Sequence, residues 1–193
     1  MSFIAAIDRF KHADFLKMNL PEFAENHLQP LPAKVVSNIP YNLTSPIVGA
    51  LMDTHTLWTT IVLLIQKEVA ERIVATPASD HYSSFGIHVQ FKAEAEIVSI
   101  VPRTVFYPPP RVDSAILRLR PRAKPLVDVL NEKVFSQTVR AGFSQRRKTL
   151  LNALSAIPDW DRERVRAALE SAGISSERRG ESRNHQIRAW VSS

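Results

Sequence analysis

The sequence contains no cysteine and only five glycines among its 193 residues. Without cysteine, the chain forms no disulfide, holds no metal through thiolates and has no cysteine nucleophile. The lack of disulfides fits a cytoplasmic protein, which is the location that we expect. The five glycines form no Gly-x-Gly pair and no Gly-x-Ser-x-Gly elbow, so the sequence gives little support to a serine hydrolase of that type.

Long apolar runs and metal-binding patterns are absent as well. The apolar run at residues 61–65 has the length of a strand, whereas a membrane-spanning helix needs about 20 residues. The six histidines do not fall at the spacing of metal ligands. Hydrophobic residues make up 45% of the chain and charged residues 23%, which is enough apolar surface for a folded core. We therefore expect a globular protein that uses neither a membrane nor a metal.

Positive charge is concentrated in one part of the chain. The formal net charge is +6. Residues 103–148 contain eleven basic and three acidic residues, so this segment alone carries +8. Such a local basic block indicates a polyanionic partner, with nucleic acid as the leading candidate. A solvated cationic face without a partner remains the alternative.

Alternating strand and helix patterns fill the first part of the chain. Residues 34–37 and 59–65 are β-branched runs. Thr44 or Ser45 is expected to cap a helix that extends to about residue 52, and residues 66–75 show helical spacing. This alternation predicts an α/β fold with a parallel or mostly parallel sheet.

The later segments predict a sheet edge and then a helical region. A helix at 82–91 precedes strands at 94–101 and 112–119, which we expect to pair antiparallel at an edge of the sheet. The proline-flanked segment 121–125 is the predicted hinge between a domain at residues 1–122 and an all-α domain at residues 126–193. The helices expected in the second domain span 131–142, 146–156 and 161–171, with Gly173 at the last helix end.

Two proline-stiffened segments have the chemistry of a base-binding site. Asn38-Ile39-Pro40-Tyr41 follows a predicted strand, and ligands of open α/β sheets bind beyond the carboxyl ends of strands. Its amide and carbonyl acceptors suit an amine, and its tyrosine ring suits a planar group. Phe106-Tyr107-Pro108-Pro109-Pro110 offers aromatic rings that stack on nucleobases. The alternatives are an ordinary turn for the first segment and inward packing for the second.

Single polar residues add two further candidates. Asp14 can accept hydrogen bonds from a ligand amine or, more commonly, cap a helix. Arg140, Arg146, Arg147 and Lys148 form the densest basic cluster, and the last three are expected to open a helix whose amides favour a phosphate. A solvated basic face explains the same cluster equally well.

Four segments, in this order, resemble signature segments of the ribosomal RNA adenine dimethyltransferases. They are Asn38-Ile39-Pro40-Tyr41, the helix start at 66–72, residues 106–114 with the pattern Phe-x-Pro-x-Pro-x-Val-x-Ser, and residues 143–150 with Phe-x-Gln-Arg-Arg-Lys. The resemblance extends from about residue 14 to about residue 181. The bacterial enzymes that dimethylate two adjacent adenines of small-subunit (16S) rRNA are the nearest variety, and the erythromycin-resistance methylases of 23S rRNA share the first segment.

The resemblance implies a fold and a set of roles. The fold is a partial Rossmann-like, S-adenosylmethionine-dependent methyltransferase sheet followed by a small all-α domain. Asn38 and the Pro40 carbonyl are implied to hold the adenine amine, Tyr41 and Phe106 to sandwich the base, and Asp14 and Asn38 to contact S-adenosylmethionine. The implied partner is small-subunit rRNA in the 30S particle, bound through Arg140, Arg146, Arg147 and Lys148. Binding to rRNA without catalysis remains the other interpretation.

The chain also departs from the family pattern. Family members begin with a strand and a Gly-x-Gly loop that cradles the cofactor, and this chain has no such loop. Residues 182–193 lack the amphipathic helix pattern that the family implies. We therefore expect an N-terminally truncated copy that binds S-adenosylmethionine poorly. Its sheet is expected to expose an apolar edge and face, which favours instability or self-association.

Overall fold

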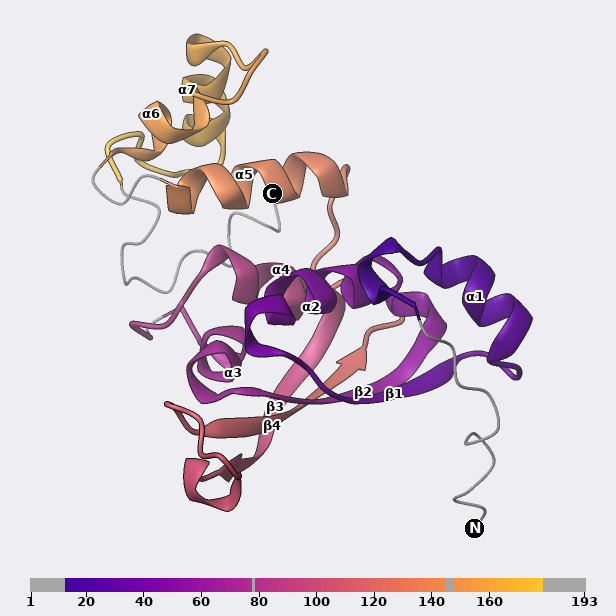
Figure 1. Ribbon diagram of the computed structural model, residues 1–193. Coiled ribbons are helices and arrows are strands. Elements are labelled where there is room, and N and C mark those ends of the chain that lie inside the picture. Colours follow the sequence, from indigo (N-terminus) through magenta and orange to yellow (C-terminus); the bar gives the residue numbers. More distant parts are fainter. Residues whose placement is uncertain (1–12, 78, 145–147, 179–193) are drawn as a thin grey trace.

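The computed structural model describes residues 13–77, 79–144 and 148–178. These residues form a four-stranded sheet with helices on one face, followed by a group of helices (Figure 1). The sheet order is β1-β2-β4-β3. Its strands are β1 (Ala33–Asn38), β2 (Trp58–Gln66), β3 (Ala93–Val101) and β4 (Ser114–Pro121).

Strand direction agrees with the sequence-based prediction of a mostly parallel sheet. β1 and β2 pair parallel, and β4 lies between β2 and β3 and pairs antiparallel with both. β1, β2 and β3 therefore run in one direction, and β4 runs in the opposite direction. The reversal follows from the connection after β3, a hairpin-like loop with the short helix η4 (Arg103–Val105) instead of a crossover helix. The predicted antiparallel pair at a sheet edge is confirmed, with β3 as the edge strand.

Helices cover one face of the sheet and bury its apolar side chains. These helices are α2 (Thr44–Asp53), α3 (Lys67–Val74) and α4 (Ser84–Lys92), which Figure 1 shows on the same side. The side chains of β2 and β4 alternate between this face and the other, as expected for period-two strands. Ile61, Leu63 and Leu117 are fully buried in the core beneath the helices.

The opposite face and the β1 edge remain open in the described part of the chain. Val36 on β1 is 81% exposed and pairs in register with the half-buried Val62. Val98 on the opposite edge strand is also exposed. This arrangement contains the exposed apolar edge and face that the sequence predicted.

Helix ends follow local capping chemistry, with one correction. Thr44 and Ser45 do not cap α2 as predicted, because they lie inside the helix, where the Thr44 hydroxyl donates to the Tyr41 carbonyl at 3.2 Å. Tyr41 belongs to the short helix η2 (Tyr41–Leu43), which precedes α2 without a break. A helix that the sequence analysis missed, α1 (Leu20–His27), is capped by Asn19. The remaining short helices are η1 (Phe15–Lys17) and η3 (His55–Leu57).

The helical part has its own buried cluster. It contains α5 (Glu132–Ser144), α6 (Leu150–Leu154) and α7 (Arg162–Ser171). Leu150, Leu154 and Leu169 are among the residues that form this cluster. Gly173, with φ +66°, follows the C-cap of α7 as predicted. The predicted helix at 146–156 is shorter in the structure, since α6 begins at Leu150 with Thr149 as its cap.

The segment between the two parts is anchored. The Arg122 and Leu126 amides donate to the carbonyls of Lys92 and Phe91, at 2.8 and 2.9 Å. The Phe91 ring also stacks on Phe135 of α5, with ring centroids 4.4 Å apart. These contacts hold α5 against α4. The division into domains at residues 1–122 and 126–193 stays a prediction.

Candidate active site

The end of β1 supplies the first wall of the candidate site. Asn38 is the last residue of the strand and pairs in register with Leu64. Its side chain is exposed and makes no hydrogen bond to another described residue. Ile39 follows and is buried, so it fixes this end of the strand in the core. Asn38 therefore keeps its amide group available beside the strand end.

Pro40 and Tyr41 turn the chain from the strand into η2. The Pro40 carbonyl accepts the Leu43 amide at 2.9 Å. A carbonyl oxygen has two lone pairs, so one of them stays open to a ligand donor. The Tyr41 hydroxyl lies 2.7 Å from the Ser114 hydroxyl, which is fully buried at the start of β4. This hydrogen bond fixes the direction of the tyrosine ring.

The β3–β4 loop supplies the facing wall. The Asp113 carboxylate accepts the Arg103 amide at 3.0 Å, and the Asp113 carbonyl accepts the Lys67 amide at 3.0 Å. The Arg103 guanidinium donates to the Arg111 carbonyl at 3.3 Å. These bonds tie both ends of the loop to each other and to α3. Phe106, half-buried just after η4, is held in place by this frame.

The two walls border one shallow, open hollow of about 320 Å³. This volume is at the lower end of the range of about 300–1,000 Å³ that is usual for small-molecule sites. The hollow is lined by Asn38, Pro40, Tyr41, Phe106, Tyr107, Pro108 and Pro110. The structure thus brings together the four residues that the sequence predicted as the base-holding group. The two aromatic rings come from segments about 65 positions apart in the chain.

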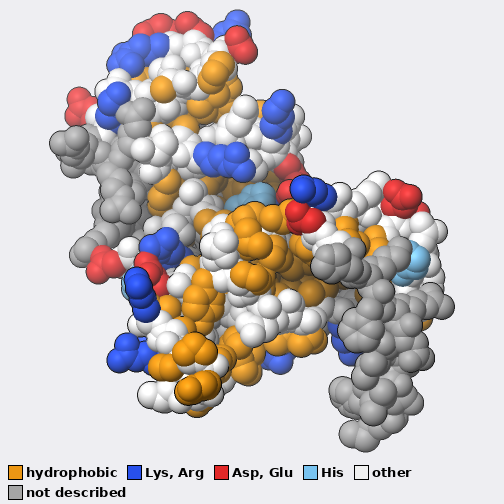
Figure 2. All heavy atoms as spheres, in the orientation of Figure 1, with side chains coloured by type: hydrophobic (Ala, Val, Ile, Leu, Met, Phe, Trp, Pro, Cys, Tyr) orange, Lys and Arg blue, Asp and Glu red, His pale blue; other side chains and the backbone are white. Residues whose placement is uncertain are grey.

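The loop tip forms an exposed apolar patch. Val105 is 65% exposed and Tyr107 is fully exposed. Figure 2 shows hydrophobic side chains gathered at this end of the molecule, with basic side chains nearby. An exposed tyrosine at the rim of a hollow provides a second flat surface for a base.

Asp14 lies elsewhere and is already engaged. Its carboxylate accepts the Leu16 amide at 3.1 Å as the cap of η1. It also forms an exposed ion pair with Lys17 at 3.5 Å. Asp14 is not among the residues that line the hollow. The described residues therefore fit a methyl donor only in part, through Asn38.

The predicted basic cluster is only partly described. Arg140 lies exposed on α5, and Lys148 is exposed two residues before α6. Arg146 and Arg147 lie outside the described residues. The preceding Phe143 packs edge-on against Tyr82, with ring centroids 5.7 Å apart. Burial raises the pKa of Tyr82, so its hydroxyl stays protonated at neutral pH.

Two residues with positioning roles were missed in the sequence. Ser114 and Asp113 are both part of the motif at 106–114, but neither was assigned a function. Their partners, Tyr41 and Lys67, lie far away in the chain. The available signal in the sequence was a serine within the alternating apolar pattern of the β4 strand, because a buried polar side chain needs a hydrogen-bond partner.

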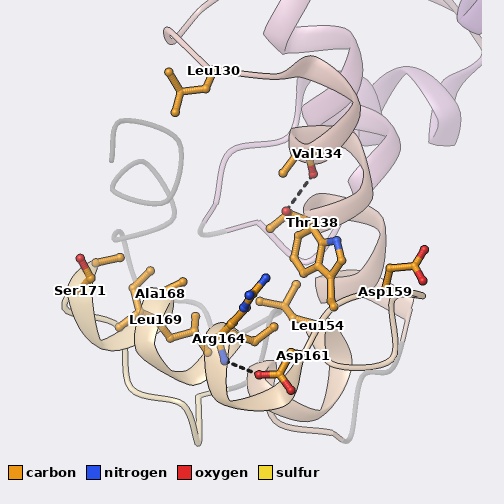
Figure 3. A pocket seen from close by; sticks show the side chains of 14 residues that line it. Leu130, Val134, Thr138, Leu154, Asp159, Asp161, Arg164, Ala168, Leu169 and Ser171 are labelled. Carbon is orange, nitrogen blue, oxygen red and sulfur yellow. Dashed lines mark hydrogen bonds between the residues drawn. The ribbon is translucent and has the colours of Figure 1, made fainter.

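The helical part contains a larger cavity of about 700 Å³. Figure 3 shows Leu154, Leu169 and Val134 among the side chains around it. The Thr138 hydroxyl donates a hydrogen bond to the Val134 carbonyl at 2.9 Å. No residue predicted for the site lines this cavity. Within residues 13–77, 79–144 and 148–178, no helix is long and apolar enough to cross a membrane. The same residues contain no cluster of three or more metal-ligating side chains.

Comparison with known proteins identifies the family. Residues 9–182 match the family model described as ribosomal RNA adenine dimethylase. Ribosomal RNA small subunit methyltransferase A of Geobacillus thermodenitrificans is 46% identical over 177 residues, which are 90% of this chain and 60% of that protein. The same-named protein of Clostridioides difficile is 42% identical, over 87% of this chain and 58% of its own length. The chain thus spans about 60% of the curated relatives that it matches.

Solved structures agree on the fold. A dimethyladenosine transferase from Plasmodium falciparum superposes with a TM-score of 0.64 at 25% identity, covering 82% of this chain and 64% of that chain. The 23S rRNA methyltransferase ErmE superposes with a TM-score of 0.60 at 30% identity, covering 89% and 65%. The described sheet is therefore part of a Rossmann-like methyltransferase fold. On the family match, the motifs and the fold together, this chain belongs to the ribosomal RNA adenine dimethylase family.

Proposed function

We propose that this chain holds an adenine of small-subunit rRNA for dimethylation of its exocyclic amine. The observation that carries the proposal is the single hollow shared by Tyr41 and Phe106, with Asn38 and the Pro40 carbonyl at its edge. Two aromatic rings in one hollow suit a flat base that has left its RNA stack. The two acceptors suit an amine, which has hydrogens to donate.

The residues of the hollow act by positioning. The Asn38 amide oxygen and the free lone pair of the Pro40 carbonyl accept the two amine hydrogens, which directs the nitrogen lone pair away from them. In each transfer the amine nitrogen gains a methyl group and releases one proton to solvent, while the bond from that methyl to the donor's sulfur breaks and its electron pair stays on the sulfur. Positive charge builds on the nitrogen as the new bond forms, and these acceptors stabilise it. Two rounds give the dimethylated amine, and the chemistry uses no covalent intermediate on the protein.

We propose S-adenosylmethionine as the methyl donor, because the family is one of methyltransferases. It supplies an electrophilic methyl group when bound. Asn38 borders the place where that methyl must meet the amine. Asp14 is the other residue that the family resemblance implies, but its carboxylate caps η1 in the structure. We therefore expect weak donor binding by this chain alone.

The partner that we propose is the 30S particle, with Arg140 and Lys148 as described RNA contacts and Arg146 and Arg147 beside them. A cytoplasmic location follows from that partner. The two curated relatives described above are named for the small subunit, whereas one structural neighbour is named a 23S rRNA methyltransferase. The incomplete donor contacts favour one alternative, an rRNA-binding protein that does not transfer methyl groups.

A short single-stranded RNA with two adjacent adenines tests base holding. One adenine is replaced by 2-aminopurine, whose fluorescence falls when it stacks between rings. We expect quenching by the chain. Tyr41→Ala should weaken binding about 5- to 150-fold, since stacking on one aromatic ring contributes about 1–3 kcal/mol. Phe23→Ala, which removes a ring from α1, is the control. Equal quenching by the Tyr41→Ala variant contradicts the proposed hollow.

A separate assay distinguishes catalysis from binding alone. Transfer of labelled methyl groups from S-adenosylmethionine to small ribosomal subunits supports the enzyme interpretation. RNA binding that depends on Tyr41, with no transfer at saturating donor, supports the binding interpretation for this chain.

A further inference from the structure

A third cavity lies where the helical part meets the sheet part. It has a volume of about 270 Å³ and lies among α2, α4 and α5. The residues proposed to hold the base do not line it. Figure 2 shows histidine and basic side chains at the surface between α5 and the helices below it. Its walls therefore come from both parts of the chain, and Arg140 is the one lining residue that the proposed function also uses.

Three serine hydroxyls line this cavity without an internal partner. Ser45 is in the first turn of α2, Ser84 begins α4, and Ser136 is on α5. None of these hydroxyls makes a hydrogen bond to another described residue. Each can donate one hydrogen to a ligand. Three serines from three helices therefore border one small volume.

Arg140 supplies a positive charge at the cavity wall. It lines the cavity and forms no ion pair with a described carboxylate. Asp53 is the one carboxylate in the lining, and its oxygen lies 3.9 Å from the ammonium of Lys92. Lys92 also pairs with Glu132 at 3.3 Å. Lys92 is thus shared between two carboxylates, whereas the Arg140 charge has no ion-pair partner among the described residues and is available to an anion.

His88 lines the same cavity and lies close to these charged groups. Its ring nitrogen lies 3.9 Å from the Asp53 carboxylate. Burial lowers the pKa of His88, and Lys92 and Arg140 lower it further, against a smaller opposite effect of Asp53 and Glu132. The neutral ring at pH 7 still offers one N–H donor toward the cavity.

Gly49 keeps the cavity open. It lies inside α2, where glycine destabilises a helix relative to alanine. A Cβ atom built on Gly49 would meet nothing within 4 Å, and the backbone there has no positive φ. Neither packing nor conformation therefore requires glycine. What the missing side chain provides is space on the cavity wall.

We propose that this cavity binds a phosphate group of the RNA strand whose base enters the Tyr41–Phe106 hollow. A phosphate carries only acceptors and negative charge, which matches the three hydroxyls and Arg140. Ser45 follows Tyr41 by four residues, from η2 into the first turn of α2, which is roughly 6–8 Å along the helix axes, so we expect one strand to reach both places. The inference rests on the proposed function and adds a backbone contact to it.

The experiment measures affinity of the whole chain for a labelled single-stranded RNA by fluorescence anisotropy at several salt concentrations. Gly49→Leu fills the cavity and leaves every charge in place. We expect about tenfold weaker binding, the effect of losing a charge-assisted hydrogen bond. The slope of log K against log salt should become shallower by about 0.7, the value for one phosphate contact on a single strand. Gly49→Ala should give a smaller loss in the same direction.

Two further variants and a control complete the design. Ser136→Ala with Arg140→Gln removes the two donors that α5 supplies and leaves α2 unaltered, and it should weaken binding in the same direction as Gly49→Leu. Arg164→Gln removes an exposed positive charge from α7 and should change affinity less than Arg140→Gln. Thermal unfolding followed by circular dichroism checks that each variant folds.

The outcomes separate this inference from the proposed function. If Tyr41→Ala weakens binding but Gly49→Leu and the double variant keep the parent affinity and slope, the phosphate subsite is wrong and the base hollow stands. If the parent chain does not bind the RNA, both proposals fail. If inorganic phosphate binds and Gly49→Leu abolishes that binding while RNA affinity is unchanged, the cavity serves a free anion and the inference is overturned.

Discussion

The hydrogen bond between Tyr41 and Ser114 connects the ring that we propose holds the base to the sheet, and a double-mutant cycle can measure its strength. The two hydroxyl oxygens are 2.7 Å apart, and Ser114 has no exposed surface. Tyr41→Phe removes one partner and keeps the ring. The Ser114 hydroxyl is then buried with no described partner, and water cannot replace the lost bond at a fully buried site.

The structure sets the expected magnitudes. An unsatisfied buried hydroxyl costs about 1–3 kcal/mol, so Tyr41→Phe should lower the free energy of unfolding by that amount. Ser114→Ala leaves the Tyr41 hydroxyl, which is half-buried and can turn to water, so its cost is about 0.5–1.5 kcal/mol. The double variant has no orphaned group. It should be less destabilised than the sum of the singles, by about 1 kcal/mol.

Urea unfolding gives the four free energies. Trp58, buried in the core of the sheet part, provides the fluorescence signal. The midpoints should shift while the slope m stays constant, because the surface exposed on unfolding is the same. RNA binding by Tyr41→Phe should fall less than by Tyr41→Ala, since the ring remains. A coupling energy below about 0.3 kcal/mol, with additive single costs, would refute the reasoning.

Three further predictions concern other parts of the molecule. Since the folded pKa of His88 lies below its unfolded value of about 6.5, the unfolded chain takes up the proton first. Stability should fall as the pH drops below about 6.5. Between pH 7.5 and 5.5, the free energy of unfolding of His88→Gln should fall less than that of the parent, as measured by urea titrations. An equal fall in both proteins would contradict the prediction that His88 causes the loss. Phe135→Ala removes the ring that stacks on Phe91, worth about 0.5–1.5 kcal/mol beyond its buried area. Trypsin should then cut the segment at 122–124 several-fold faster than in the parent. An unchanged rate of cleavage would show that other contacts hold α5 on α4. Val36→Lys, at the open edge of β1, should change stability by less than about 0.5 kcal/mol. In sedimentation velocity it should reduce concentration-dependent association; unchanged association would show that another surface is responsible.

The sequence by itself determined the family and most of the secondary structure. Period-two and helical patterns placed all four strands and most of the helices within a few residues, because burial of one face depends on local spacing. Proline at position 40 and the prolines at 108–110 marked two rigid segments, since proline restricts the backbone wherever it occurs. In the structure Asp14 caps a helix, which is the common role that the sequence analysis had named as the alternative.

Other features followed only from contacts between distant residues. The position of β4 between β2 and β3 depends on which apolar faces meet in the core, and local alternation does not encode that choice. The same holds for the meeting of Tyr41 and Phe106, the Tyr41–Ser114 hydrogen bond and the serine-lined cavity around Gly49. Each of these features joins segments that are distant in the chain and pack together only in the folded protein. The sequence determines the chemistry of these residues, and the tertiary structure determines that they lie close together.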